Sequence, residues 1–156
     1  MRRYLDASLL VAALTREAAT ARVQACLAAQ PADDPTISNW VVTELSSALS
    51  IKLRTGQIAV AHRAAALAQF ARLRAENVMT VPVTRQHFLA AARLADRHEV
   101  GLRAGDALHL AVCADVGALM CTLDRRLAEA ARDVGVETEI PYPATRAAVL
   151  RSLTSA

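Results

Sequence analysis

An apolar run, an acid and a helical stretch follow one another in ALMCTLDRRLAEAARD, residues 118–133. The run predicts a strand over 118–123, and the stretch after it predicts a helix over 124–133. The same order opens the chain in RYLDAS, residues 3–8, where we expect a strand over 3–5 and a helix from about Ser8 to Leu14. A strand that ends at an acid and passes directly into a helix is the unit from which we derive the fold.

Between these two units, strands and helices continue to alternate, which favours a parallel sheet with helices on both faces. No repeat, linker or low-complexity tract interrupts the 156 residues, so we expect one domain over 1–156. The remaining expected strands cover 36–38, 78–83 and 136–140, and the remaining expected helices cover 18–29, 41–53, 58–73, 84–98, 104–114 and about 145–153.

Composition excludes several classes of function. The chain is 54% hydrophobic but only 3% aromatic, so it has too few rings for a module that stacks nucleic-acid bases. The formal charge of +3 is compatible with a polyanionic partner without requiring one. No G-x-G-x-x-G motif follows the first strand, which disfavours a dinucleotide enzyme. A phosphotransfer receiver domain would need a late lysine, but Lys52, in an earlier helix, is the only lysine.

Three features indicate a cytoplasmic protein. The cysteines are three in number and lie in apolar stretches, which is typical of reduced core residues. The apolar run after Arg2 and Arg3 is short and is interrupted by Asp6, unlike a secretory signal. No apolar run approaches the length of a membrane span.

Four acids lie at element ends among apolar residues: Asp6, Glu44, Asp106 and Asp124. Charges in such places are usually paired or hold a metal. Asp6 and Asp124 follow strands directly, at the sheet edge where ligands bind in parallel sheets. Glu44 shares a helical face with apolar residues, and Asp106 opens an apolar helix. Because oxygen ligands select Mg²⁺ or Mn²⁺ over zinc, we predict a magnesium or manganese site.

Each acid also has a plain structural interpretation. Asp6, Asp106 and Asp124 could cap the helices that they precede or open. Glu44 is harder to explain in this way, since a structural acid on a buried face would need a buried partner.

Three polar neighbours accompany these acids. Ser8 lies two residues after the first acid and Thr122 two residues before the last, so their hydroxyls could orient waters or ligands, or else only cap elements. His109 lies one helical turn after Asp106. A lone histidine on an apolar helix is more often a hydrogen-bonded core residue than a catalyst.

Clustered carboxylates with Mg²⁺ suit phosphodiester hydrolysis, because the ion activates a water and neutralises charge on the phosphate. Residues 4–8, 43–45, 102–111 and 122–128 resemble, in order and spacing, the four signature blocks of PIN-domain ribonucleases. More narrowly, the chain is similar to the VapC toxins of bacterial type II toxin–antitoxin modules.

This resemblance implies a PIN-like three-layer α/β/α fold with a central five-stranded parallel sheet. It implies a Mg²⁺- or Mn²⁺-dependent endoribonuclease that is a homodimer and is inhibited by a small cognate antitoxin. Cleavage would leave 5′-phosphate and 3′-hydroxyl ends. By matched position, Asp6, Glu44 and Asp106 would be the main metal ligands and Asp124 a peripheral one. The hydroxyls of Ser8 and Thr122 would then support these ligands.

Two other functions stay open at this stage. One is a housekeeping nuclease of RNA maturation, and the other is a binding module on the same fold with negligible catalysis. Transfer, ribosomal and messenger RNA are all open as targets.

Overall fold

The computed structural model describes residues 2–29 and 35–141, and its strands form one all-parallel sheet in the order β3-β2-β1-β4-β5. Within the sheet, Tyr4 on the central strand β1 pairs with Thr36 on one side and Met120 on the other. The predicted parallel α/β fold is therefore confirmed. The strands are β1 (Arg3–Leu5), β2 (Pro35–Ser38), β3 (Met79–Val81), β4 (Leu119–Cys121) and β5 (Thr138–Glu139).

The helices connect these strands much as the sequence predicts. They are α1 (Ala7–Leu14), α2 (Thr20–Ala28), α3 (Asn39–Arg54), α4 (Val60–Glu76), α5 (Arg85–Ala95), α6 (Ala104–Asp115) and α7 (Arg125–Asp133). The helix expected near 145–153 lies outside the described residues. β4 is shorter than expected, because Thr122 and Leu123 leave the strand to enter the turn before α7.

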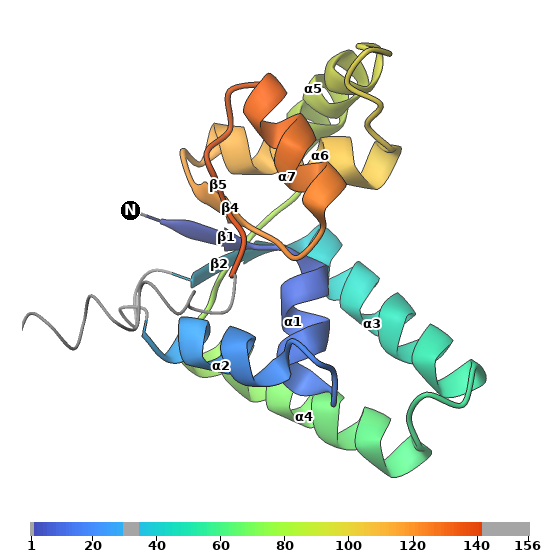
Figure 1. Ribbon diagram of the computed structural model, residues 1–156. Helices are drawn as coiled ribbons and strands as arrows, with labels where there is room; N and C mark the ends of the chain where they lie inside the picture. Colours follow the sequence, from blue (N-terminus) through green and yellow to red (C-terminus); the bar gives the residue numbers. More distant parts are fainter. Residues whose placement is uncertain (1, 30–34, 142–156) are drawn as a thin grey trace, which may run out of the picture.

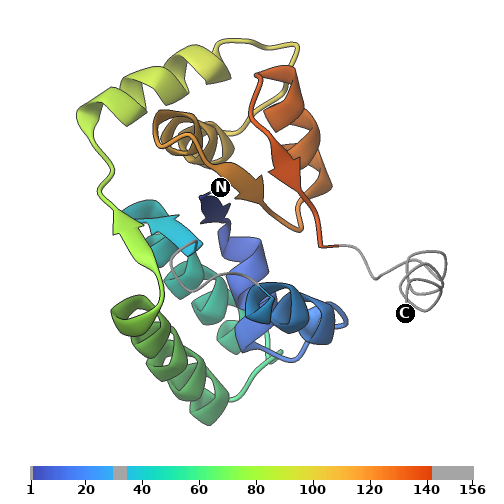
Figure 2. The same ribbon diagram turned by 90° about the vertical axis from the view of Figure 1, so that its left-hand side faces the viewer.

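The helices form two layers, one on each face of the sheet (Figure 1). In one layer α1 packs against α2, α3 and α4, and in the other α5 packs against α6. The second layer also meets the sheet through contacts of α6 with β4 and of α7 with β5. This division follows from right-handed crossovers, because the chain runs in one direction from β1 to β3 and in the opposite direction from there to β5 (Figure 2).

Aliphatic side chains dominate the core, which lies between the sheet and the helices. Leu10, Ile37, Leu45 and Leu110 are all at most 1% exposed, as expected for a chain with few aromatic residues. The cysteines are all free thiols, and Cys113 and Cys121 are buried while Cys26 is only half-buried. The expectation of a core position was thus wrong for Cys26. Within the described ranges, every helix is too short or too polar to span a bilayer.

The connection order changes direction between β1 and β4. β1 is followed in the chain by β2 on one side, whereas β4 on its other side is reached only after β3. Such switch points leave a crevice at the carboxyl ends of the strands. The backbone N–H of Asp6 donates to the carbonyl of Cys121 at 3.0 Å across this point, so the first predicted acid lies at its edge.

Candidate metal centre

Asp6 is positioned by the end of β1 and the start of α1. Its backbone is extended, and its side chain caps α1 by accepting from the backbone N–H of Ser8 at 3.3 Å. The capping interpretation is therefore correct, but it accounts for only one contact of a side chain that is 6% exposed. Burying a carboxylate to this degree requires further partners.

Ser8 and Thr122 supply those partners. The Ser8 hydroxyl donates to Asp6 Oδ2 at 2.5 Å, and the Thr122 hydroxyl donates to the same oxygen at 2.8 Å. Both hydroxyls also accept backbone N–H groups, from Leu123 and Asp124 respectively. Oδ2 is thus held from two elements, while Oδ1 remains 3.5 Å from His109 Nε2. The two hydroxyls orient the first acid.

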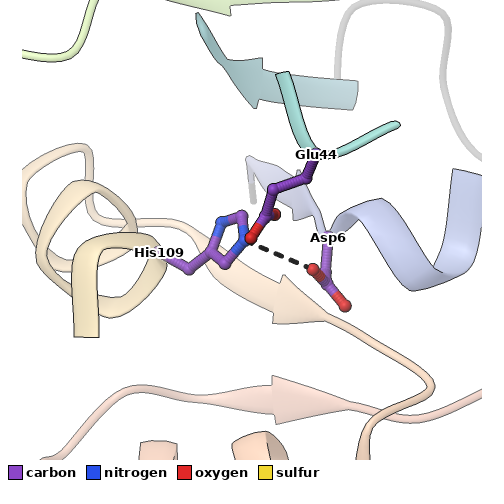
Figure 3. Close-up of side chains that lie close together, drawn as sticks. All are labelled: Asp6, Glu44 and His109. Carbon is purple, nitrogen blue, oxygen red and sulfur yellow. Dashed lines mark hydrogen bonds and ion pairs between the residues drawn. The ribbon is translucent and has the colours of Figure 1, made fainter. Parts of the chain in front are cut away.

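Glu44 and His109 meet across the crevice from α3 and α6 (Figure 3). His109 Nε2 lies 2.5 Å from Glu44 Oε2. An acid on this face of α3 requires a buried partner. Glu44 has one, because His109 is only 2% exposed. Burial lowers the pKa of His109, but the hydrogen bond to Glu44 and the charges of Asp6, Glu44 and Asp106 outweigh this effect and raise the pKa.

Asp106 lies in the first turn of α6 and is half-buried. The positive end of the helix favours an acid there. Burial nevertheless raises the pKa of Asp106, and the charge of Asp124 raises it further. The backbone N–H of Arg103 opposes this rise by donating to the carboxylate. An acid held in this way gains from a nearby cation.

Asp124 differs from the other three acids because it is exposed. Its Oδ1 accepts from the backbone N–H groups of Arg126 and Leu127, at 2.8 and 3.2 Å, and so caps α7. The expectation that all four acids are sheltered among apolar residues was wrong at this position. The strand–acid–helix pattern predicts that Asp124 lies at the sheet edge, but it does not determine how exposed the residue is.

One cavity of about 610 Å³ collects all four acids. Ser8 and His109 also line it, and Thr122 reaches it only through its hydrogen bond to Asp6. A further acid, Glu17 in the turn between α1 and α2, lines the cavity and pairs with Lys52 at 2.8 Å. The predicted convergence of acids from distant parts of the sequence is therefore seen in the fold.

The donor set fits a divalent cation. Asp6, Glu44 and His109 each offer one ligand atom, and these atoms lie within 4.8 Å of one another. Asp106 and Asp124 bring two more carboxylates to the same cavity. Several anionic oxygens around one space repel one another unless a cation or protons intervene, and hard oxygen donors suit Mg²⁺ or Mn²⁺.

Two residues outside the predicted set also border the site. His109 is the hydrogen-bonded core histidine that the sequence favours, but it also lines the cavity, which its spacing of one helical turn from Asp106 indicates. The sequence does not single out Gly105, yet a Cβ there would lie 3.2 Å from Glu44 Oε1 and 3.5 Å from Trp40 Nε1. No local pattern indicates that contact.

Comparisons with known proteins agree with this fold. The sequence model of the PIN domain family matches residues 3–133. The fold is similar to VapC20 from Mycobacterium tuberculosis, described as a Sarcin-Ricin loop cleaving toxin, with a TM-score of 0.67, 23% identity and coverage of 86% of this chain and 95% of that one.

Two further solved structures have the same fold. FitAcB from Neisseria gonorrhoeae has a TM-score of 0.66 and 19% identity, over 89% of this chain and 97% of the other. VapBC2 from Rickettsia felis, bound to a DNA fragment from their promoter, has a TM-score of 0.66 and 17% identity, over 90% and 98%. A search among curated proteins found no match.

Proposed function

Because the chain belongs to the PIN domain family, we propose that it is a Mg²⁺- or Mn²⁺-dependent endoribonuclease that hydrolyses RNA phosphodiester bonds. PIN domains are generally nucleases. The observation that carries the proposal is the convergence of Asp6, Glu44, Asp106 and Asp124 on one cavity at the switch point of the sheet. This is the arrangement that metal-assisted phosphodiester hydrolysis needs.

In this proposal Asp6, Glu44 and Asp106 hold the metal, and Asp124 has a more peripheral role. When bound, a divalent ion supplies an activated water and neutralises charge on the phosphate. The hydroxyls of Ser8 and Thr122 fix Oδ2 of Asp6, which leaves Oδ1 to face the cavity. Glu44 is fixed by His109 from the opposite side. The site is therefore organised by the protein's own hydrogen bonds.

We further propose that the protein is the toxin of a type II toxin–antitoxin module, acting in the cytoplasm as a homodimer. The support is the likeness of its fold to VapC20 and to the toxin–antitoxin complex VapBC2. A small antitoxin would then inhibit it. Co-expression with the product of a short adjacent reading frame tests this point: the antitoxin should co-purify and suppress cleavage. A nuclease with no such neighbour would instead indicate a role in RNA maturation.

The first experiment is cleavage of total RNA by the purified protein with Mn²⁺. We expect discrete fragments that disappear with EDTA and in Asp106→Asn, Asp6→Asn and Glu44→Gln, each of which should stay folded. Asp133→Asn is the matched control, because it removes one exposed acid outside the cavity and should cleave like the wild type.

Two results would contradict the proposal. Intact RNA with a folded wild-type protein that still binds Mn²⁺ would favour the binding module without catalysis. Loss of the folded state in both Asp6→Asn and Asp106→Asn would mean that these acids are structural.

A further inference from the structure

A line of buried polar side chains runs from the core to Glu44. Ser38 Oγ lies 2.7 Å from the Tyr4 hydroxyl, which lies 2.9 Å from His109 Nδ1. The other ring nitrogen, Nε2, meets Glu44 Oε2 at 2.5 Å. We call these four residues the buried relay. They come from β2, β1, α6 and α3, and the first three are at most 2% exposed.

The donors and acceptors of the buried relay have one consistent direction. Ser38 Oγ accepts from the backbone N–H of Val41 as the cap of α3. The Tyr4 phenol carries one proton, which it can donate to only one of its two partners. If that proton goes to His109 Nδ1, Ser38 can donate to the Tyr4 oxygen, and every proton has an acceptor. If Tyr4 donates to Ser38 instead, the Ser38 proton has no acceptor among the described residues.

With Nδ1 accepting from Tyr4, the imidazole hydrogen lies on Nε2. Nε2 then donates to the Glu44 carboxylate, and its lone pair is not free for a metal. Coordination of a metal by Nε2 would require the whole buried relay to reverse, and the Ser38 proton would then have no acceptor in the described part of the chain. The hydrogen-bond pattern therefore favours His109 as a donor to Glu44 over His109 as a ligand.

Resting on the proposed function, we propose that His109 is a positioning residue: fixed by Tyr4 and Ser38, it donates to Glu44 Oε2 and so aims Glu44 at the metal beside Asp6. Figure 3 shows the imidazole reaching both acids from α6. Glu44 needs such help because its side chain is long, flexible and 29% exposed. Groups that orient a metal ligand by hydrogen bonding commonly affect metal affinity.

The position of Tyr4 explains why the buried relay sets the geometry of the site. Tyr4 lies on the central strand two residues before Asp6. The same rigid strand therefore places Asp6 directly and places Glu44 through His109. Both acids are therefore positioned relative to β1, although Glu44 itself belongs to α3.

The first test is Mn²⁺ affinity measured by isothermal titration calorimetry. We expect His109→Leu to weaken Mn²⁺ binding by about 10- to 100-fold. His109→Gln keeps an N–H near the position of Nε2 and should restore affinity to within about fivefold of the wild type, while Tyr4→Phe should fall between the two. A folded His109→Leu protein with wild-type affinity would overturn the inference.

His87 offers a matched control for burial. It is also a buried histidine with a carboxylate partner, Asp115 at 3.1 Å, but it caps α5 and does not line the cavity. His87→Leu should lower the Tm and leave Mn²⁺ affinity unchanged. An equal loss of affinity in His87→Leu and His109→Leu would mean that His109 acts only through general stability.

Two spectroscopic readouts do not depend on activity. In the metal-free protein, ¹⁵N NMR of the His109 ring should show the hydrogen on Nε2, and a hydrogen on Nδ1 alone would overturn the inference. In the Mn²⁺-loaded protein, pulsed EPR should show no directly coordinated ¹⁴N, and a strong coupling lost in His109→Leu would overturn it in favour of a ligand. A wild type that neither binds Mn²⁺ nor cleaves RNA refutes the proposed function itself.

Discussion

Gly105 provides a sharp test of how closely Glu44 is held. A Cβ at this position would lie 3.2 Å from Glu44 Oε1, 3.5 Å from Trp40 Nε1 and 3.6 Å from Trp40 Cζ2. Gly105→Ala therefore adds one methyl group directly against a proposed metal ligand. Two consequences of opposite sign follow, one for stability and one for the site.

Stability should rise. Gly105 lies in the first turn of α6 and has no positive φ, so alanine fits its backbone. Replacing glycine by alanine in a compatible conformation stabilises a protein by about 0.4–1 kcal/mol, mainly by restricting the unfolded chain. For a domain of this size that corresponds to a rise in Tm of about 1–4 °C.

Metal affinity should fall. The new methyl group requires Glu44 Oε1 to move by a few tenths of an ångström, while Oε2 is held by His109 at 2.5 Å. The carboxylate must therefore rotate about its fixed oxygen. Sites of this kind tolerate displacements of only about 0.5 Å, and a shift of about 1 Å costs about 100-fold. We expect Mn²⁺ binding weaker by about three- to tenfold.

Scanning calorimetry and isothermal titration with Mn²⁺ measure the two effects on the same protein. Gly101→Ala is the control, because Gly101 has a φ of +66° and a Cβ there would meet nothing within 4 Å. That variant should lose about 1–2 kcal/mol of stability and keep its Mn²⁺ affinity. A Gly105→Ala protein that binds Mn²⁺ like the wild type would refute the reasoning, as would a fall in its Tm.

Three other predictions concern the acids and the metal. Asp124→Asn should reduce RNA cleavage less than Asp106→Asn, because Asp124 is exposed; the reverse order in measured kcat/KM would contradict the assigned roles. Because the pKa of folded Asp106 is raised by burial, its contribution to metal-free stability is present below about pH 3.9 and is lost as the pH rises through the folded pKa. Urea titrations should therefore show the stability of Asp106→Asn relative to wild type increasing over that window, and a constant difference would argue against the burial effect. Finally, Mn²⁺ at 100 times its Kd should stabilise the wild type by about 2.7 kcal/mol, or about 5–10 °C in Tm, and an unchanged Tm would show that no ion binds.

Much of the fold could be predicted because its signals are local. An apolar run followed by an acid and a helix identifies the ends of β1 and β4, and a parallel sheet brings those ends to one edge. Asp6 and Asp124 could therefore be placed from neighbouring residues alone. Glu44 and Asp106 could be added because an acid on an apolar helical face needs a partner. The cavity that collects all four confirms this convergence, while their roles as ligands stay a prediction.

What only the tertiary structure decided is how these acids are held and sheltered. The contact of Tyr4 with His109 joins residues 105 positions apart, and that of His109 with Glu44 joins residues 65 apart. Such pairs depend on the rotation of α3 and α6 over the sheet, which no local pattern determines. The same holds for the approach of Gly105 to Glu44 and for the exposure of Asp124. Residue type and periodicity thus determined which acids reach the site, and helix packing determined which of them are fixed, buried and paired.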